Sequence, residues 1–179
     1  NLSVRRLCRM LGKQIGLDRL DLEKLDLAAL LHDIGKASVP SKILLKTAPL
    51  TDEEREDVKR HAEAGYKVAS AATPDVASVA DEILSHHERW DGTGYPSGLR
   101  GEDIPLLSRI IALADAFDVM TRETPYRPAK TRDKALREVK EQAGRQFDPN
   151  LAALLLEIAA RLDEEPEDSL PPVRDFTIE

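Results

Sequence analysis

Residues 106–122 read LLSRIIALADAFDVMTR, and this segment decides the class of fold. Pro105 comes directly before it, a position that proline favours at the first turn of a helix. We therefore predict a helix over residues 106–122 with an unusually apolar interior. Asp115 lies inside this apolar run, where an ionised carboxylate is costly unless it is paired or bound to a metal ion. Asp115 is therefore a candidate functional residue.

Helical patterns also cover most of the chain on either side of this segment. Apolar residues recur at three- and four-residue spacing, and strand-like alternation is hard to find. Thr51 and Glu54 form the pattern of a capping box, and Gly35 stands where a helix could end. The predicted helices cover residues 3–15, 19–34, 51–72, 74–87, 132–143 and 149–162. A glycine-rich loop over residues 89–104 interrupts them, so we expect an all-α bundle.

The composition indicates one soluble domain. The chain has 179 residues, of which 41% are hydrophobic and 33% charged, enough to bury a core. We assign the domain to residues 1–162, and residues 163–179 to an acidic, proline-containing tail or linker. The net charge of −7 argues against a nucleic-acid duplex or an anionic membrane as partner. No membrane-spanning segment is predicted, and the single cysteine, Cys8, is typical of a cytoplasmic protein.

The four histidines are the other candidates for chemistry. They are His32, His61, His86 and His87. Imidazole and carboxylate ligands suit Fe, Mn, Ni or Zn, and the lack of further cysteines excludes a thiolate zinc site. Each residue also has a structural interpretation, because helical histidines are often hydrogen-bonded core residues and Asp115 could pair with an arginine such as Arg109. The residues taken singly leave both interpretations open.

Two motifs together resemble a known family. Residues 32–36, HDIGK, match the HD motif of metal-dependent phosphohydrolases. Residues 86–96, HHERWDGTGYP, resemble the HHExxDGxGYP motif of the HD-GYP subgroup. The resemblance extends over about residues 2–160 and implies an HD-type helical bundle with a glycine-rich GYP loop. It also implies a phosphodiesterase that hydrolyses cyclic di-GMP to linear pGpG and, in some members, on to GMP.

The resemblance further implies the composition of the site. Two or three divalent ions, most often iron or manganese, would be bound by His32, Asp33, His61, His86, His87 and Asp115. Asp33 would bridge two ions and, with Lys36 beside the reacting phosphate, would be catalytic. The substrate would be held by Gly94 and Tyr95 of the loop and by Arg122 and Arg127. Two such ions neutralise a phosphodiester and make hydroxide available near pH 7.

Two departures from the family pattern keep alternatives open. Members usually carry a further His or Glu ligand in the first helix, and an arginine where this chain has Thr124. One alternative is therefore a non-catalytic cyclic di-GMP receptor or protein-interaction output module. Another is an HD phosphohydrolase that acts on a different nucleotide. We also expect an upstream sensor or receiver domain in the full-length protein, and a homodimer is one arrangement that the sequence leaves open.

Overall fold

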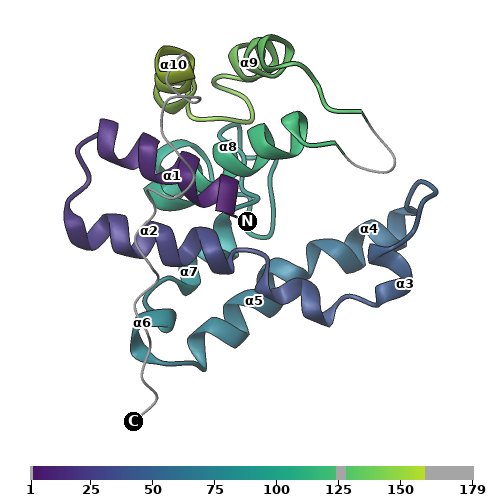
Figure 1. The fold of residues 1–179 in the computed structure, drawn as a ribbon. Coiled ribbons are helices and arrows are strands. Elements are labelled where there is room, and N and C mark those ends of the chain that lie inside the picture. The colour runs from purple at the N-terminus through teal and green to yellow at the C-terminus, as the bar shows by residue number, and fades with distance from the viewer. Residues whose placement is uncertain (1, 124–127, 160–179) are drawn as a thin grey trace.

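Helix α8 (Leu106–Thr121) lies at the centre of the structure, a computed structural model that describes residues 2–123 and 128–159 (Figure 1). The other helices, with η marking 3-10 helices, are α1 (Leu2–Gln14), α2 (Arg19–Leu31), η1 (Ile34–Ser38), α3 (Ser41–Leu44), α4 (Asp52–Lys59), α5 (His61–Ser70), α6 (Pro74–Ala77), α7 (Ala80–Ser85), η2 (Gly101–Asp103), α9 (Arg132–Glu141) and α10 (Pro149–Ile158). Within the described ranges the only β-type pairing is an isolated bridge between Ala143 and Phe147. The predicted all-α bundle is confirmed.

The apolar residues of α8 form the middle of the core. Ile110, Ile111 and Leu113 are fully buried, and α8 packs against α1, α2, α7, α9 and α10. Burying each such side chain contributes about 1.5–3 kcal/mol relative to leaving it in water. Asp115 is therefore held on a helix that packing fixes from several sides.

Three of the predicted helices are wrong in their extent. The helix expected over 19–34 ends at Leu31, and the chain continues as η1. The helix expected over 51–72 divides into α4 and α5, and the one over 74–87 divides into α6 and α7. The short helix α3 was not among the predicted elements. The capping box of α4 is confirmed, with Glu54 N donating to Thr51 Oγ1 over 3.2 Å and Thr51 N donating to the Glu54 carboxylate over 2.8 Å.

Side chains that bond to nearby carbonyl groups accompany these breaks. His32 Nδ1 lies 2.9 Å from the carbonyl oxygen of Ala29, where α2 ends. His61 Nδ1 lies 2.6 Å from that of Val58, at the junction of α4 and α5. Ser78 Oγ donates to Asp75 O over 2.6 Å between α6 and α7. Such local bonds offer carbonyl groups an alternative to the regular helical ladder.

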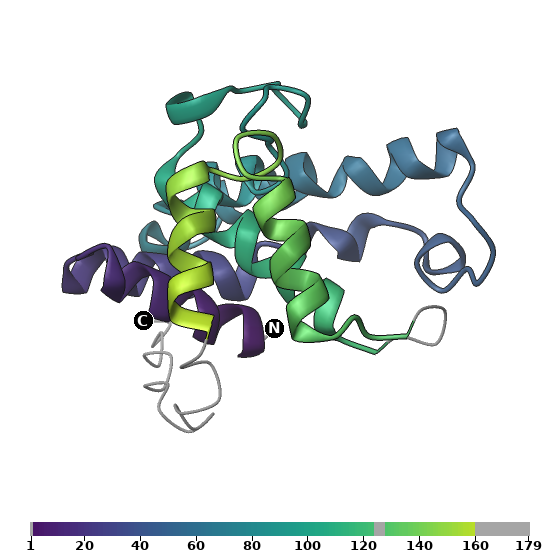
Figure 2. The same cartoon turned by 90° about the horizontal axis from the view of Figure 1, so that it is seen from above.

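Helices α9 and α10 lie side by side, and the turn between them is joined to the glycine-rich loop (Figure 2). Trp90 N donates to Gln146 O over 3.2 Å, and Asp91 N donates to Arg145 O over 2.8 Å. The segment of α3 and α4 projects away from these helices (Figure 1). No helix in the described ranges is both long enough and apolar enough to cross a membrane.

Candidate metal centre

The four histidines lie together in one cluster. His32 follows α2, His61 begins α5, and His86 and His87 follow α7. The distances between the centroids of neighbouring rings run from 4.0 Å to 5.3 Å. The structure therefore brings together residues that are up to 55 positions apart in the sequence (87 − 32).

Backbone carbonyl groups fix the orientation of three of the rings. Nδ1 of His32 and of His61 each face a carbonyl oxygen, and Nδ1 of His86 lies 2.6 Å from Ile83 O. A carbonyl can only accept, so Nδ1 carries the proton and Nε2 presents its lone pair, as in most metal-binding histidines. His61 Nε2 and His86 Nε2 are 3.3 Å apart. Two lone pairs at this distance are stabilised by a shared cation.

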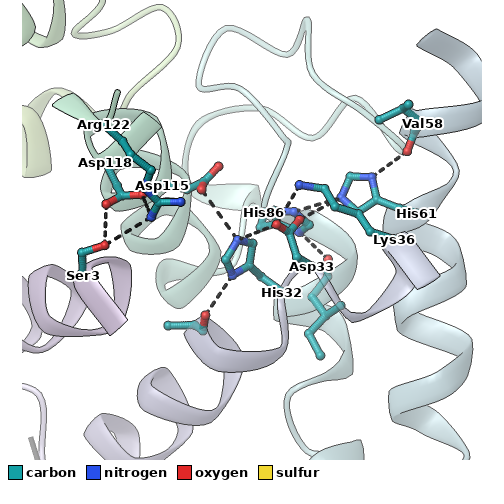
Figure 3. Close-up of polar contacts among 12 residues, drawn as sticks. Ser3, His32, Asp33, Lys36, Val58, His61, His86, Asp115, Asp118 and Arg122 are labelled. Atoms are coloured by element: carbon teal, nitrogen blue, oxygen red, sulfur yellow. Dashed lines mark hydrogen bonds and ion pairs between the residues drawn. The ribbon is translucent and has the colours of Figure 1, made fainter. Parts of the chain in front are cut away.

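Asp33 stands between two groups of potential ligands (Figure 3). Its Oδ1 lies 3.6 Å from His61 Nε2, and its Oδ2 lies 3.5 Å from His32 Nε2. The first group consists of His61, His86 and His87, whose ligand atoms and that of Asp33 all lie within 4.8 Å of one another. The second consists of His32 and Asp115, with Nε2 and Oδ1 3.7 Å apart.

Two buried atoms of this cluster lack a hydrogen-bond partner. They are His32 Nε2 and Asp33 Oδ1. Leaving such groups unpaired costs about 1–3 kcal/mol each, a penalty that ligation of a metal ion removes. The donor set of imidazoles and carboxylates suits borderline divalent metals. The residues present therefore fit a divalent metal centre.

The protonation states of His61, His86, His87 and Asp115 also suit metal binding. Burial lowers the pKa of His61 and of His86, and it lowers that of His87 to about 3. Burial opposes charge on His32 as well, but the neighbouring carboxylates of Asp115 and Asp33 raise its pKa, so a metal ion bound at His32 would displace a proton. Burial works to raise the pKa of Asp115, yet the neighbouring His32 lowers it overall. Neutral imidazoles and ionised carboxylates are the forms that bind metals.

Lys36 and Tyr95 border the cluster. Lys36 Nζ donates to Asp33 Oδ2 over 2.7 Å, and its side chain is 42% exposed, so the ammonium is accessible from the solvent side. The Tyr95 ring stacks on His87 with centroids 4.9 Å apart, and Lys59 Nζ lies 5.6 Å from its centroid. Burial raises the pKa of Tyr95, which keeps the phenol protonated at neutral pH.

Glu88 holds the glycine-rich loop in place. Its buried carboxylate accepts from Ser97 N over 2.7 Å and from Leu99 N over 3.1 Å. Gly94 packs directly on the chain before it, since a Cβ atom there would lie 2.4 Å from Arg89 N and 2.6 Å from the Cα atom of Glu88. The motif thus fixes Tyr95 beside His87.

The predicted phosphate-binding residue Arg122 does not join the cluster. The Arg122 guanidinium bonds to Asp118 and lies 3.4 Å from Ser3 Oγ, in a group separate from the histidines (Figure 3). Arg127 and Thr124 lie outside the described residues. The alternative pairing of Asp115 with Arg109 is wrong, because Arg109 Nη1 donates to the buried Asp148 over 2.7 Å. Helix α1 carries no histidine or carboxylate.

The structure adds residues that the sequence analysis did not select. A cavity of about 520 Å³ extends from His86, His87 and Asp115 to the side chains of α9. Lys59 and Glu138 line it as well. Both belong to strongly charged helical segments, a pattern typical of a solvated surface, so nothing in the sequence distinguishes them.

Comparisons with known proteins show the family to which the chain belongs. The family model described as HD domain matches residues 1–151. The cyclic di-GMP phosphodiesterase response regulator RpfG of Xanthomonas campestris pv. campestris is 42% identical over 156 residues, covering 87% of this chain and 41% of the relative. A cyclic di-GMP phosphodiesterase of Thermotoga maritima is 36% identical over 86% of this chain and 42% of its own length. A 3′3′-cGAMP-specific phosphodiesterase of Vibrio cholerae is 38% identical over 84% of this chain and 29% of its own.

Solved structures share the fold. A cyclic GMP-AMP-specific phosphodiesterase of Vibrio cholerae (V-cGAP3) matches with a TM-score of 0.69 at 24% identity, over 91% of this chain and 44% of that one. A HDG"Y"P protein from Bdellovibrio bacteriovorus matches with a TM-score of 0.70 at 22% identity, over 89% and 51%. The chain spans about two fifths of the length of the first two curated relatives. With its HDIGK and HHERWDGTGYP motifs in one cluster, the chain belongs to the HD domain family and to the HD-GYP group within it.

Proposed function

We propose that this domain is a metal-dependent phosphodiesterase that hydrolyses cyclic di-GMP to linear pGpG. The observation that carries the proposal is the position of Asp33, which lies within 3.6 Å of a histidine from each of two ligand groups. A shared carboxylate of this kind suits a pair of ions, the arrangement used in many phosphoryl-transfer sites. The printed names of relatives at 36% and 42% identity support cyclic di-GMP as the substrate.

The metal centre would hold two divalent ions, with iron and manganese as our candidates. One ion would be bound by His61, His86 and His87, and the other by His32 and Asp115, with Asp33 bridging them. The ions would supply Lewis acidity toward the phosphodiester and lower the pKa of bound water. A third ion, which the family resemblance implies, would raise the metal content above two ions per chain.

The chain's own groups would position the substrate and stabilise charge. Lys36 is accessible and already bonds to Asp33, so its ammonium would stabilise the negative charge that develops on the phosphate and the leaving ribose oxygen. Tyr95 keeps its proton and offers an O–H donor and an aromatic face. Gly94 allows the loop backbone to pack against Glu88 and thereby fixes Tyr95. A role of Arg122 and Arg127 in phosphate binding remains part of this proposal.

We propose that the full-length protein joins this domain, over residues 1–162, to an upstream sensor or receiver domain in the cytoplasm. One relative, of whose length the matched region covers 41%, is named a response regulator. Residues 163–179 would be a linker or tail, and a homodimer would be one form of assembly. Size-exclusion chromatography with light scattering measures the assembly directly.

The decisive experiment is an anaerobic assay of the domain loaded with Fe²⁺ or Mn²⁺, with products followed by mass spectrometry. Linear pGpG or GMP is the expected product. No product from protein with confirmed metal would overturn the proposal. Because α1 lacks a ligand, that result would favour the second candidate, a cyclic di-GMP receptor that signals without hydrolysis.

A further inference from the structure

The cavity beside the metal centre has two walls of different chemistry. On one side are metal-ligand candidates, His86, His87 and Asp115. On the other are side chains of α9 and of the turn that follows it, Glu138, Gln142 and Gln146. The two sides belong to one space of about 520 Å³, a volume in the usual range for small-molecule sites. A ligand whose phosphate lies at the metal centre would therefore have room to extend toward α9.

The surface between these walls is apolar and built from small side chains. Ala112, Ala116 and Val119 recur at helical spacing on one face of α8, and Met120 and Phe147 complete it. Such a surface suits the face of a purine base, which is flat and apolar, and the methionine sulfur packs favourably against aromatic rings. This apolar surface itself carries no cation for a second phosphate; the cations that line the same cavity are Lys59 and Arg89.

Glu138 is negatively charged, whereas a phosphodiester, itself negative, is bound by positively charged groups. Its carboxylate is an acceptor only, and it repels phosphate. It pairs with Lys130, which leaves it further lone pairs for a ligand. A carboxylate at the wall of this cavity therefore calls for hydrogen-bond donors on the ligand.

We propose that this side of the cavity binds one base of the substrate, and that Glu138 selects guanine over adenine. The edge of guanine presents two adjacent donors, N1–H and the 2-amino group, and one carboxylate accepts both. The corresponding edge of adenine presents the bare N1 acceptor next to the 6-amino donor, so the carboxylate would face a lone pair. This inference rests on the proposed function, since it assumes that the diester lies at the metal centre.

Binding of nucleoside monophosphates tests the inference without any turnover. With metal-loaded protein in a calorimeter, we expect affinity to fall in the order GMP, IMP, AMP, because IMP lacks the 2-amino group and AMP lacks both donors. The bidentate contact is expected to favour GMP over AMP by about tenfold to a hundredfold. Equal affinities for GMP and AMP would overturn the proposal.

The variant Glu138→Gln provides the sharper test. A glutamine amide offers one acceptor and one donor, the complement of the adenine edge. We therefore expect weaker GMP binding and stronger AMP binding, so that the GMP preference disappears. The matched control is Glu141→Gln, which removes the same charge from an exposed position on the same helix. A loss of affinity that is equal for GMP and AMP would instead assign Glu138 a merely structural role with Lys130.

Turnover separates this inference from the proposed function. Wild-type protein should hydrolyse cyclic di-GMP at least tenfold faster than cyclic di-AMP, and Glu138→Gln should reduce that ratio. Hydrolysis of bis(p-nitrophenyl) phosphate, which has no base, should be unchanged in the control Glu141→Gln and reports on the metal centre alone. If wild type hydrolyses neither cyclic dinucleotide nor the base-free diester, the proposed function fails, while the GMP and AMP affinities still decide the role of Glu138. If it hydrolyses them with an unchanged ratio in the variant, only the inference fails.

Discussion

Gly35 lies so close to His61 that a Cβ atom at Gly35 would stand 1.9 Å from the carbonyl oxygen of His61. The same atom would lie 2.5 Å from Gly65 N, so η1 and α5 meet backbone to backbone. Asp33 directly precedes η1, and His61 begins α5. The contact at Gly35 therefore sets the distance between the carboxylate and one of its histidine neighbours.

Replacing Gly35 with alanine is expected to separate Asp33 from His61. Because the obstacle is backbone, η1 must move, and we expect a loss of about 1–3 kcal/mol in the free energy of unfolding. Metal affinity should fall at least tenfold. Urea unfolding and metal titration of the same sample measure both effects. The control is Ala37→Ser, at an exposed position in η1; a metal affinity equal to that of wild type in Gly35→Ala would refute this account.

The shared position of Asp33 predicts how metal stoichiometry responds to mutation. Asp115→Asn weakens only the group that contains His32, so we expect one ion to be retained per chain. Asp33→Ala removes the carboxylate shared by the two ligand groups, so it should weaken the binding of both ions. Activity should then fall by more than about a hundredfold. His86→Ala should also abolish turnover.

Elemental analysis after gel filtration measures these stoichiometries. A surface variant such as Asp52→Asn, at a side chain 98% exposed, serves as control. Full activity in Asp33→Ala would contradict the assignment, and equal metal loss in Asp115→Asn and Asp33→Ala would contradict the two-group arrangement.

The architecture could be predicted from the sequence because it depends on local pattern. The apolar face of α1 and the continuous apolar stretch of α8 predict both helices to within about two residues of their ends. The breaks after Leu31 and at Arg60 could not be predicted in the same way. They coincide with histidines whose ring nitrogens bond to carbonyl groups, while packing against other helices holds those rings.

In the candidate site, too, some residues could be predicted from the sequence and others could not. The histidines and Asp33 could be selected from two motifs, since both are continuous in sequence. Glu138 could not, because its place in the cavity depends on how α9 packs against α8. Lys59 could not be predicted either, since only the tertiary structure places it over the ring of Tyr95. Charged residues of this kind are ordinary on helix surfaces, so sequence alone gives no reason to choose them.

Glu88 is expected to act on substrate affinity through the loop that carries Tyr95. In Glu88→Gln the amide group can no longer accept from both Ser97 N and Leu99 N, and one buried donor loses its partner at a cost of about 1–3 kcal/mol. We expect KM for cyclic di-GMP to rise about tenfold, with metal content unchanged and faster hydrogen exchange in residues 93–99. Glu102→Gln, at an exposed position farther along the same loop, is the control. Unchanged KM and exchange would show that Glu88 does not position the loop.

The stability of the metal-free protein is expected to fall as the pH drops below about 6.5. Burial lowers the pKa of His61, His86 and His87 in the folded state, so below the ordinary value of 6.5 the unfolded chain binds more protons. The contribution of His32 to stability has the opposite sign, because its pKa is raised in the folded state. This contribution is fully present below pH 6.5 and is lost as the pH rises. Three histidines outweigh one, so we expect the free energy of unfolding to decrease by about 2 kcal/mol from pH 7.5 to pH 5.5. Urea unfolding in the presence of a chelator measures this difference between the two pH values. The variant His87→Asn should make the difference smaller. A free energy of unfolding that stays constant or rises toward pH 5.5 would show that the imidazoles are not held neutral in the fold.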